Sequence, residues 1–198
     1  RAVNQYLNKI LETENDDYVL ASDTDSLYVT LDSLVQRVGL TDTNKIIEFM
    51  DKVCEGKIQD VIDKCYGEMA EYVNAFEQKM VMKREVLAEV GIWTGKKHYI
   101  LNVHNSEGVQ YDEPKLKIMG IEAIKSSTPE PCRNALKEAF KIMMNGTEDD
   151  VINYIEDFKT KFKTLPAEEV SFPRSVKGLA KYHDSASIYQ KSTPIHVK

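Results

Sequence analysis

The sequence predicts an α+β fold, and three patterns along the chain support this prediction. Residues 18–31 form two apolar, β-prone runs around four small polar residues, which is typical of a β-hairpin. Residues 41–76 carry apolar side chains at helical spacing, which predicts a long helix. Strand-like segments fill residues 80–123, and helical spacing returns after Lys125. We therefore expect an antiparallel sheet that the long helix covers on one face, followed by a smaller, mostly helical subdomain.

Apolar spacing and end-forming residues place the helices. Val3 to Leu11 repeat apolar side chains at helical spacing, so a short amphipathic helix is expected to open the chain. Thr41-Asp42-Thr43 offers an N-cap for the long helix, which we expect to be interrupted near Gly56 because glycine is a poor helix former. Two later helices are expected to begin at Ser126-Ser127-Thr128-Pro129 and at Thr147-Glu148-Asp149-Asp150.

The segment between the long helix and Lys125 predicts strands separated by turns. Gly91-Ile92-Trp93-Thr94-Gly95 and Asn105-Ser106-Glu107-Gly108 are rich in turn-forming residues. The strands that we expect around these turns are Met80 to Val90, His98 to Val103, Val109 to Asp112 and Lys115 to Ala123. Together with the first hairpin, they would form one antiparallel sheet.

The composition is that of an ordinary globular protein. The 198 residues are 42% hydrophobic and 29% charged, and no apolar run approaches the length of a membrane span. No signal-peptide pattern is present, and the chain begins at Arg1, so we expect a piece of something longer. The three cysteines, Cys54, Cys65 and Cys132, have no metal-ligand spacing and do not suit a disulfide framework. A cytoplasmic location without a membrane partner is therefore expected.

The net charge of −6 disfavours extended contact with nucleic acid, but its distribution permits a local contact surface. Lys79 to Lys125 contain eight basic and six acidic residues, whereas the rest of the chain is acidic. Within this segment Lys96-Lys97 precedes Tyr99 at a turn, which can present ammonium groups and a phenol to a polyanion. Lys115-Leu116-Lys117 places two lysines on the polar face of a strand. The alternative interpretation of both features is an ordinary solvated surface.

The first hairpin carries two carboxylates at its tip, in Asp23-Thr24-Asp25-Ser26. Two carboxylates about 4 Å apart repel by about 4 kcal/mol at an effective dielectric constant of about 20. A divalent cation such as Mg²⁺ between them would remove this repulsion and supply chemistry. An EF-hand is excluded because Leu27 and Tyr28 stand where a ligand and the turn glycine belong. On composition alone, a solvated turn is the simpler interpretation.

The residue motifs in these segments also resemble those of a known family. Asp23-Thr24-Asp25-Ser26 between two apolar strands resembles the metal-binding palm hairpin of family B DNA polymerases. Three longer blocks follow in the family's order and resemble its T-even-type bacteriophage branch: Trp93-Thr94-Gly95-Lys96-Lys97, Glu113-Pro114-Lys115-Leu116-Lys117-Ile118-Met119-Gly120 and Lys125-Ser126-Ser127-Thr128-Pro129. The resemblance covers nearly the whole chain and implies the C-terminal part of the palm in residues 1–125 and the beginning of the thumb in residues 126–198.

The resemblance also implies roles for individual residues. Asp25 would hold both catalytic metals, with Asp23 beside it, and Glu85 matches an acidic residue near the active site. Lys97 and Tyr99 would grip the primer strand near its 3′ end. The remaining residues that we expect at DNA are Lys96, Lys117, Lys125 in the minor groove, and Arg174 in a segment that tracks the duplex backbone. Two positions depart from the family: Lys83 stands where close relatives carry an acid, and Ser22 replaces a glycine before the hairpin tip.

The implied activity is that of a DNA-directed DNA polymerase. Such an enzyme attacks a deoxynucleoside triphosphate with the primer 3′-OH and depends on two Mg²⁺ ions. The implied partners are primer–template DNA, the triphosphate, an upstream polymerase region in the same or a separate chain, and a sliding clamp. The location would be the bacterial host cytoplasm if a phage encodes the chain. Neither the family's second metal aspartate nor its basic fingers helix is recognisable, so the chain alone is expected to be inactive.

Two other function classes are compatible with the same residues. A two-metal phosphohydrolase or nuclease would need further carboxylates or histidines near the hairpin, and the four histidines are scattered. A non-catalytic module that binds duplex DNA would bind it without regard to Mg²⁺ or to the loss of Asp25. Metal dependence and Asp25 substitution therefore distinguish the non-catalytic module from the two metal-dependent enzymes.

Overall fold

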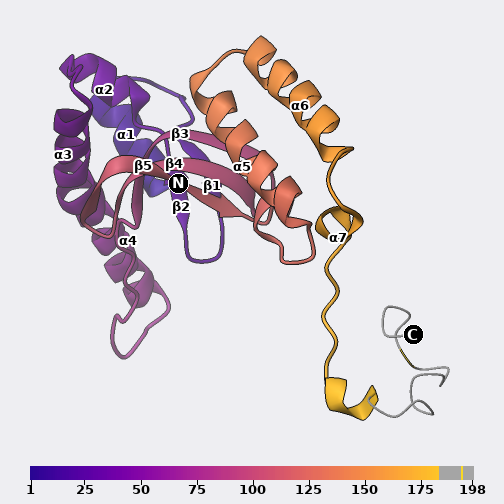
Figure 1. Ribbon diagram of the computed structural model, residues 1–198. Helices are drawn as coiled ribbons and strands as arrows, with labels where there is room; N and C mark the ends of the chain where they lie inside the picture. The colour runs from indigo at the N-terminus through magenta and orange to yellow at the C-terminus, as the bar shows by residue number, and fades with distance from the viewer. Residues whose placement is uncertain (183–192, 194–198) are drawn as a thin grey trace. The chain divides into compact units, whose positions relative to one another are not determined.

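The computed structural model describes residues 1–182 and residue 193, and its chain divides into two compact units. The first unit comprises Arg1–Glu89 and Val103–Lys115, and the second comprises Val90–Asn102 and Leu116–Lys198. Helices and strands follow one another in groups along the chain, as expected for an α+β protein (Figure 1). Within the described ranges no helix has the length and apolar character needed to cross a membrane.

The elements of the first 85 residues confirm the expected hairpin and helices and add one helix. The α-helices are α1 (Ala2–Leu11), α2 (Asp32–Val38), α3 (Thr43–Val53) and α4 (Gln59–Tyr72), and the hairpin strands are β1 (Val19–Ser22) and β2 (Leu27–Val29). The short helix α2 was not expected from the sequence. Asp42 is the N-cap of α3, and its side chain accepts a hydrogen bond from the Lys45 amide at 2.9 Å.

The helix does not break at Gly56. A π-helical turn, η1 (Cys54–Ile58), connects α3 directly to α4. Each π turn accommodates one extra residue, so the side chains that follow face a different direction from those of a regular α-helix. Gly56 lies inside this turn. The expected interruption is therefore a local widening of the helix, which continues into α4.

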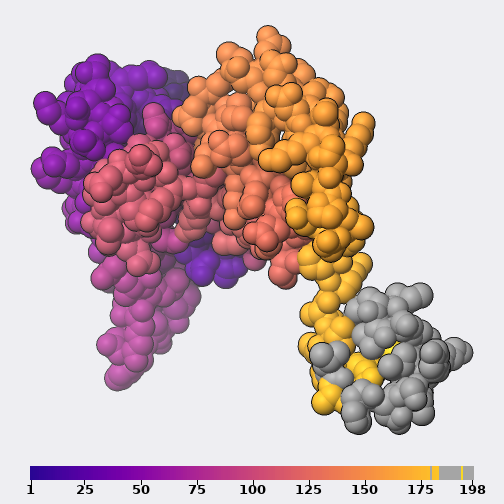
Figure 2. Space-filling model, in the orientation of Figure 1, coloured from indigo at the N-terminus to yellow at the C-terminus, as the bar shows by residue number. Residues whose placement is uncertain are grey.

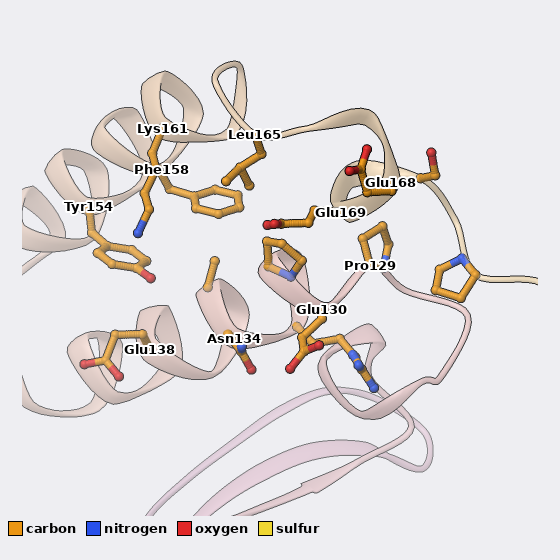
Figure 3. A pocket seen from close by; sticks show the side chains of 15 residues that line it. Pro129, Glu130, Asn134, Glu138, Tyr154, Phe158, Lys161, Leu165, Glu168 and Glu169 are labelled. Carbon is orange, nitrogen blue, oxygen red and sulfur yellow. The ribbon is translucent and has the colours of Figure 1, made fainter.

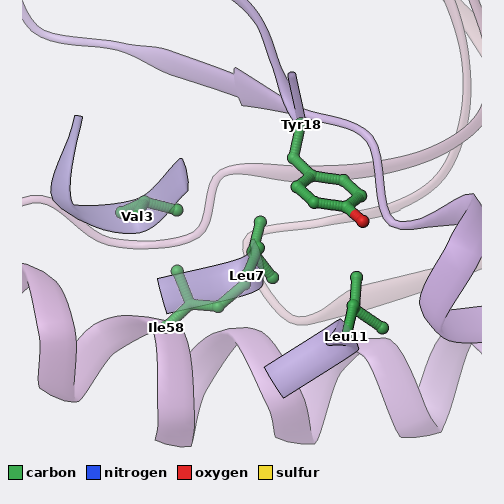
Figure 4. Close-up of a cluster of buried hydrophobic side chains, with 5 residues drawn as sticks. All are labelled: Val3, Leu7, Leu11, Tyr18 and Ile58. Atoms are coloured by element: carbon green, nitrogen blue, oxygen red, sulfur yellow. The ribbon is translucent and has the colours of Figure 1, made fainter. Parts of the chain in front are cut away.

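The core of the first unit lies between α1, the hairpin and the π turn (Figure 4). Its buried side chains are Val3, Leu7, Leu11, Tyr18 and Ile58. Leu7 has no exposed surface, and the partly buried Leu27 and Val29 of β2 pack against the cluster. The i, i+4 spacing of the α1 residues places them on one helix face, which therefore fixes one side of the hairpin.

The strands form two sheets rather than the single sheet that we expected. β1 and β2 pair only with each other, and a separate sheet has the order β3 (Val86–Gly95), β4 (His98–Ser106) and β5 (Val109–Met119). The expected turn at residues 91–95 is wrong, because β3 continues through it and the turn lies at Lys96-Lys97. A Cβ on Gly91 would lie 2.7 Å from the Trp93 ring and 2.8 Å from Leu101 Cδ2, so this glycine serves close packing within a strand.

Two further strand boundaries differ from the expected ones. Residues 80–85 are not in a strand, and the two strands expected after Gly108 are one continuous β5 that includes Pro114. Proline cannot donate to a neighbouring strand, but β5 stands at the edge of its sheet and tolerates it.

The second unit has its own core and a helical part. Ile100, Ala123 and Phe140 are buried together, and Leu116, Ile118, Ile121, Leu136 and Met144 pack against them. The remaining elements are η2 (Glu122–Ile124), α5 (Glu130–Asn145), α6 (Glu148–Phe162), α7 (Ala167–Val170) and η3 (Leu179–Tyr182). Thr147 caps α6 in a capping box with Asp150, as its sequence predicts. An open pocket of about 900 Å³ lies between α5, α6 and α7 (Figure 3).

Candidate metal hairpin and nucleic-acid interface

The hairpin tip places Thr24 and Asp25 at its outermost point. Ser22 pairs with Leu27, and the Asp23 amide donates to the Ser26 carbonyl at 3.0 Å, which leaves a two-residue loop. The Asp23 Oδ1 accepts the Thr24 amide at 2.9 Å, so one oxygen of this half-buried carboxylate already supports the turn. Asp25 is exposed. The two carboxylates predicted to bind metal are therefore at one tip, and Asp25 is the more accessible of the two.

Two asparagines of α1 hold the base of this hairpin. The Asn4 Oδ1 accepts the amides of Tyr18 and Val19 at 2.7 and 3.3 Å, and the buried Asn8 donates to the Asp16 carbonyl at 2.8 Å. Because the helix and the strand are thereby joined through polar as well as apolar contacts, the tip extends from a fixed base. Asn4 and Asn8 were not among the predicted site residues, although two asparagines beside the apolar face of a helix are a usable signal.

Glu85 is exposed and immediately precedes β3. Its carbonyl accepts the Glu107 amide at 2.7 Å. Among the residues that the structure describes, no three of His, Cys, Asp or Glu gather in a group that could hold a metal ion. A metal role for Glu85 therefore stays a prediction, and the hairpin offers a cation two carboxylates.

Arg84, beside Glu85, has a buried side chain at the centre of an ionic cluster. Only 6% of its side chain is exposed; its guanidinium pairs with Asp51 and Glu55, the latter at 3.7 Å, and donates to the Asn105 Oδ1 at 2.7 Å. Its Nε is buried and has no hydrogen-bond partner within the described part of the chain. These contacts join the segment before β3 to α3, η1 and the end of β4. Burial raises the pKa of the neighbouring Cys54 thiol to about 11, so this partly buried cysteine is a protonated thiol that packs against the core.

In the second unit, the turn between β3 and β4 carries the predicted DNA-binding lysines. Lys96 and Lys97 are exposed, and the backbone of Lys97 is left-handed, with a φ of 61°. The His98 Nδ1 lies 2.7 Å from the Lys96 carbonyl. Tyr99, by contrast, is buried, with its ring centroid 6.2 Å from that of Trp93. A contact of the Tyr99 phenol with DNA stays a prediction.

The segment after β5 lies against this turn. An ideal Cβ on Gly120 would lie 2.4 Å from the Lys97 carbonyl oxygen, so only glycine permits the approach. The Lys125 ammonium pairs with Glu122 at 2.5 Å, and this hydrogen bond, with a smaller contribution from the charge of His98, lowers the pKa of the Glu122 carboxyl. The structure thus brings the Lys96-Lys97 turn and the segment that carries Lys125 together.

The other predicted DNA-binding residues are more scattered. Lys117 is half-buried on β5, and Arg174 is exposed in the segment after α7. Asp23, Asp25 and Glu85 belong to the first unit, whereas Lys96, Lys97, Tyr99, Lys117, Lys125 and Arg174 belong to the second. The metal-hairpin candidate therefore lies in the first unit, and the predicted DNA-binding residues lie in the second.

Comparison with known proteins gives these features a common context. Residues 10–159 match the family model described as "Divergent Family B DNA polymerase". The chain is 39% identical to the DNA-directed DNA polymerase of Escherichia phage RB69 over its full length, and 35% identical to that of Enterobacteria phage T4 over 93% of its length. It spans 23% and 22% of the lengths of these two relatives.

Proposed function

We propose, because the chain belongs to the divergent family B DNA polymerases, that it forms the metal-binding and primer-gripping part of a DNA-directed DNA polymerase. The observation that carries the proposal is the Asp23–Ser26 hairpin tip, with its exposed Asp25, in a chain of this family. Residues 1–125 would be the C-terminal part of the palm, and residues 126–198 the beginning of the thumb. Primer–template DNA and a deoxynucleoside triphosphate are the proposed substrates.

Asp25 and Asp23 would hold Mg²⁺. The residues fit this ion because Mg²⁺ takes one or two carboxylates and fills its remaining positions with water and substrate phosphates. A third protein carboxylate is therefore not required for Mg²⁺ to bind at the hairpin. When bound, Mg²⁺ would stabilise the negative charge that develops on the attacking and leaving oxygens of phosphoryl transfer. The Asp23–Thr24 hydrogen bond keeps the turn in shape and leaves Asp25 accessible to the ion.

Lys97 and Lys125 would contact the primer–template duplex. Minor-groove acceptors are nearly alike for A·T and G·C pairs, so a lysine there can respond to pair geometry without reading base identity. The closeness of the Lys96-Lys97 turn to the Gly120–Lys125 segment supports a shared surface for these residues. Lys117, Arg174 and the Tyr99 phenol are further candidates for this surface.

The rest of the polymerase, in the same chain or a separate one, is the proposed protein partner. The C-terminal end of α4 and the residues after it expose Met69, Tyr72, Val73 and Phe76 (Figure 2, magenta). Exposed apolar surface of this kind is typical of a protein contact. Glu71 accompanies it, and its charge is unsuited to DNA. A sliding clamp is a further proposed partner, by analogy with replicative polymerases.

Asp25→Ala is expected to remove Mn²⁺ binding at the hairpin and to leave the fold intact. The variant loses the accessible carboxylate, whereas Asp23→Ala loses one whose Oδ1 already bonds Thr24, so its effect on affinity should be smaller. The melting temperature of Asp25→Ala should stay the same or rise, because a repulsive charge is removed. Electron paramagnetic resonance titration with Mn²⁺ measures the affinity, and Asp112→Ala, which removes an exposed carboxylate on β5, is the matched control. Equal affinities in all four proteins would make the hairpin an ordinary turn.

Lys97→Ala and Lys125→Ala are each expected to weaken binding to primer–template duplexes by about 1 kcal/mol or more. The loss should be similar for every duplex sequence, because a minor-groove lysine meets acceptors common to all base pairs. Fluorescence anisotropy with several labelled duplexes measures it, and Lys163→Ala is a control for the loss of one exposed ammonium. Losses that vary strongly with base sequence would contradict the minor-groove assignment.

A further inference from the structure

Lys97 occupies a backbone conformation that its side chain does not favour. Its φ is 61°, in the left-handed region where glycine is the usual residue, and it is one of two residues in the turn between β3 and β4. The neighbouring Gly95 belongs to β3 instead. A non-glycine residue persists in this region when its surroundings determine its conformation, and such residues are concentrated at functional sites.

Gly120 is the first residue that holds this turn in place. It follows β5 and itself has a φ of 72°. A Cβ at this position would meet the Lys97 carbonyl oxygen at 2.4 Å and the His98 ring at 2.9 Å. The Lys97 peptide therefore lies directly on the backbone of another segment of the second unit, at a separation that no other amino acid would allow.

His98 is the second residue that holds this turn. Its Nδ1 lies 2.7 Å from the Lys96 carbonyl, and because a carbonyl only accepts, the Nδ1 must carry the proton and donate it. The ring also lies against Gly120. The carbonyls of both turn residues are thus in contact with fixed groups, Lys96 through His98 and Lys97 through Gly120.

We propose that His98 and Gly120 are positioning residues for DNA binding, which fix the backbone of the Lys96-Lys97 turn so that both ammonium groups start from defined positions. The inference rests on the proposed function, because it supposes that these lysines contact DNA. Neither residue needs to touch the nucleic acid. Lysine side chains are long and flexible, so a backbone fixed in advance lowers the entropy lost when they bind phosphate or groove atoms.

The donor of His98 can be tested with a pair of substitutions. The Asn side-chain Nδ2 stands close to where the histidine Nδ1 stands, so His98→Asn retains a donor for the Lys96 carbonyl, whereas His98→Leu has none. Each chain is titrated with a fluorescein-labelled primer–template duplex at salt concentrations from about 50 to about 200 mM. Affinity that depends on phosphate contacts falls steeply over this range. Gly120→Ala tests the second contact in the same assay.

Wild type and His98→Asn are expected to bind within about twofold of each other. His98→Leu and Gly120→Ala are expected to bind about five- to tenfold more weakly, and the slope of log K against log salt should decrease by about 1, the value of one lost phosphate contact. A purely stabilising role would lower the melting temperature but leave the affinity and the salt slope of the folded protein unchanged. If Gly120→Ala does not fold, the two His98 variants still decide.

The double variant Lys96→Ala/Lys97→Ala separates this inference from the proposed function. If the double variant binds like wild type, the turn does not contact DNA and its role in the proposed function is wrong. If the double variant loses affinity but His98→Leu does not, the lysines contact DNA and the positioning role of His98 is overturned. Equal losses in His98→Asn and His98→Leu would also overturn it, because the retained donor would then have no effect.

Discussion

Arg84→Ala is expected to lower the free energy of unfolding by about 3 kcal/mol, because it removes one partner of a largely buried ion pair. The Arg84 side chain is 6% exposed, and its guanidinium contacts Asp51, Glu55 and Asn105. Its removal leaves the carboxylate of Asp51, which is 28% exposed, without its cation. The estimate is at the low end for a buried pair because Glu55, which is 64% exposed, remains in contact with water.

Urea denaturation followed by far-ultraviolet circular dichroism measures this loss. Arg37→Ala is the matched control, since Arg37 forms an exposed pair with Glu12 at 2.9 Å and should contribute less than about 1 kcal/mol. Arg84→Lys should be intermediate, because a lysine retains the charge but cannot place several donors in a planar fork. If Arg84→Ala costs no more than Arg37→Ala, the cluster is screened by solvent and does not join its segments.

Local patterns were enough to predict the hairpin and most helices. The Asp23–Ser26 tip, the start of α3 at Asp42 and the capping box at Thr147 each depend on residues within four positions of one another. Such features are encoded in a short window, so the sequence reveals them directly. The helix α2 was missed because no side chain caps its start and it has no buried residues.

Features that depend on distant contacts were predicted less well. Gly91 indicated a turn by its type, but its missing side chain makes room for Trp93 and Leu101 inside a sheet. Two strands were expected where β5 is a single one that includes Pro114, and the edge position that lets a strand hold a proline is decided by tertiary structure. The separation of the strands into two sheets is likewise a matter of pairing between segments, which periodicity does not encode.

The same distinction applies to the candidate site. The two hairpin carboxylates and the Lys96-Lys97 pair could be identified from short motifs. The residues that support them were harder to find, since the hairpin is held by Asn4 and Asn8 of α1, 10 or more positions before its strands, and Gly120 meets Lys97 from more than 20 positions away. Supporting contacts of this kind join segments remote in sequence, and a single sequence carries no mark of which segments will meet.

The isolated 198-residue chain is expected not to extend a primer, although it belongs to a polymerase family. Phosphoryl transfer with two metals uses carboxylates on both sides of the metal pair. In the described part of the chain the hairpin provides Asp23 and Asp25, and no third acidic or histidine side chain joins them in a metal-binding group. The triphosphate also needs basic side chains to offset its charge, and before the hairpin the basic residues are Arg1 and Lys9.

A primer-extension assay with highly purified chain, Mg²⁺ and all four deoxynucleoside triphosphates tests this expectation. Asp25→Ala is run beside the wild type, so that any contaminating polymerase appears equally in both. Supplying the remaining polymerase regions, in the same chain or as a partner, should produce extension with wild type and reduce it by at least about a hundredfold with Asp25→Ala, as expected when a metal-holding carboxylate is lost. Robust extension by the isolated wild-type chain, absent from Asp25→Ala, would instead mean that these 198 residues assemble a complete active site. The second group of metal ligands would then have to be sought within this chain.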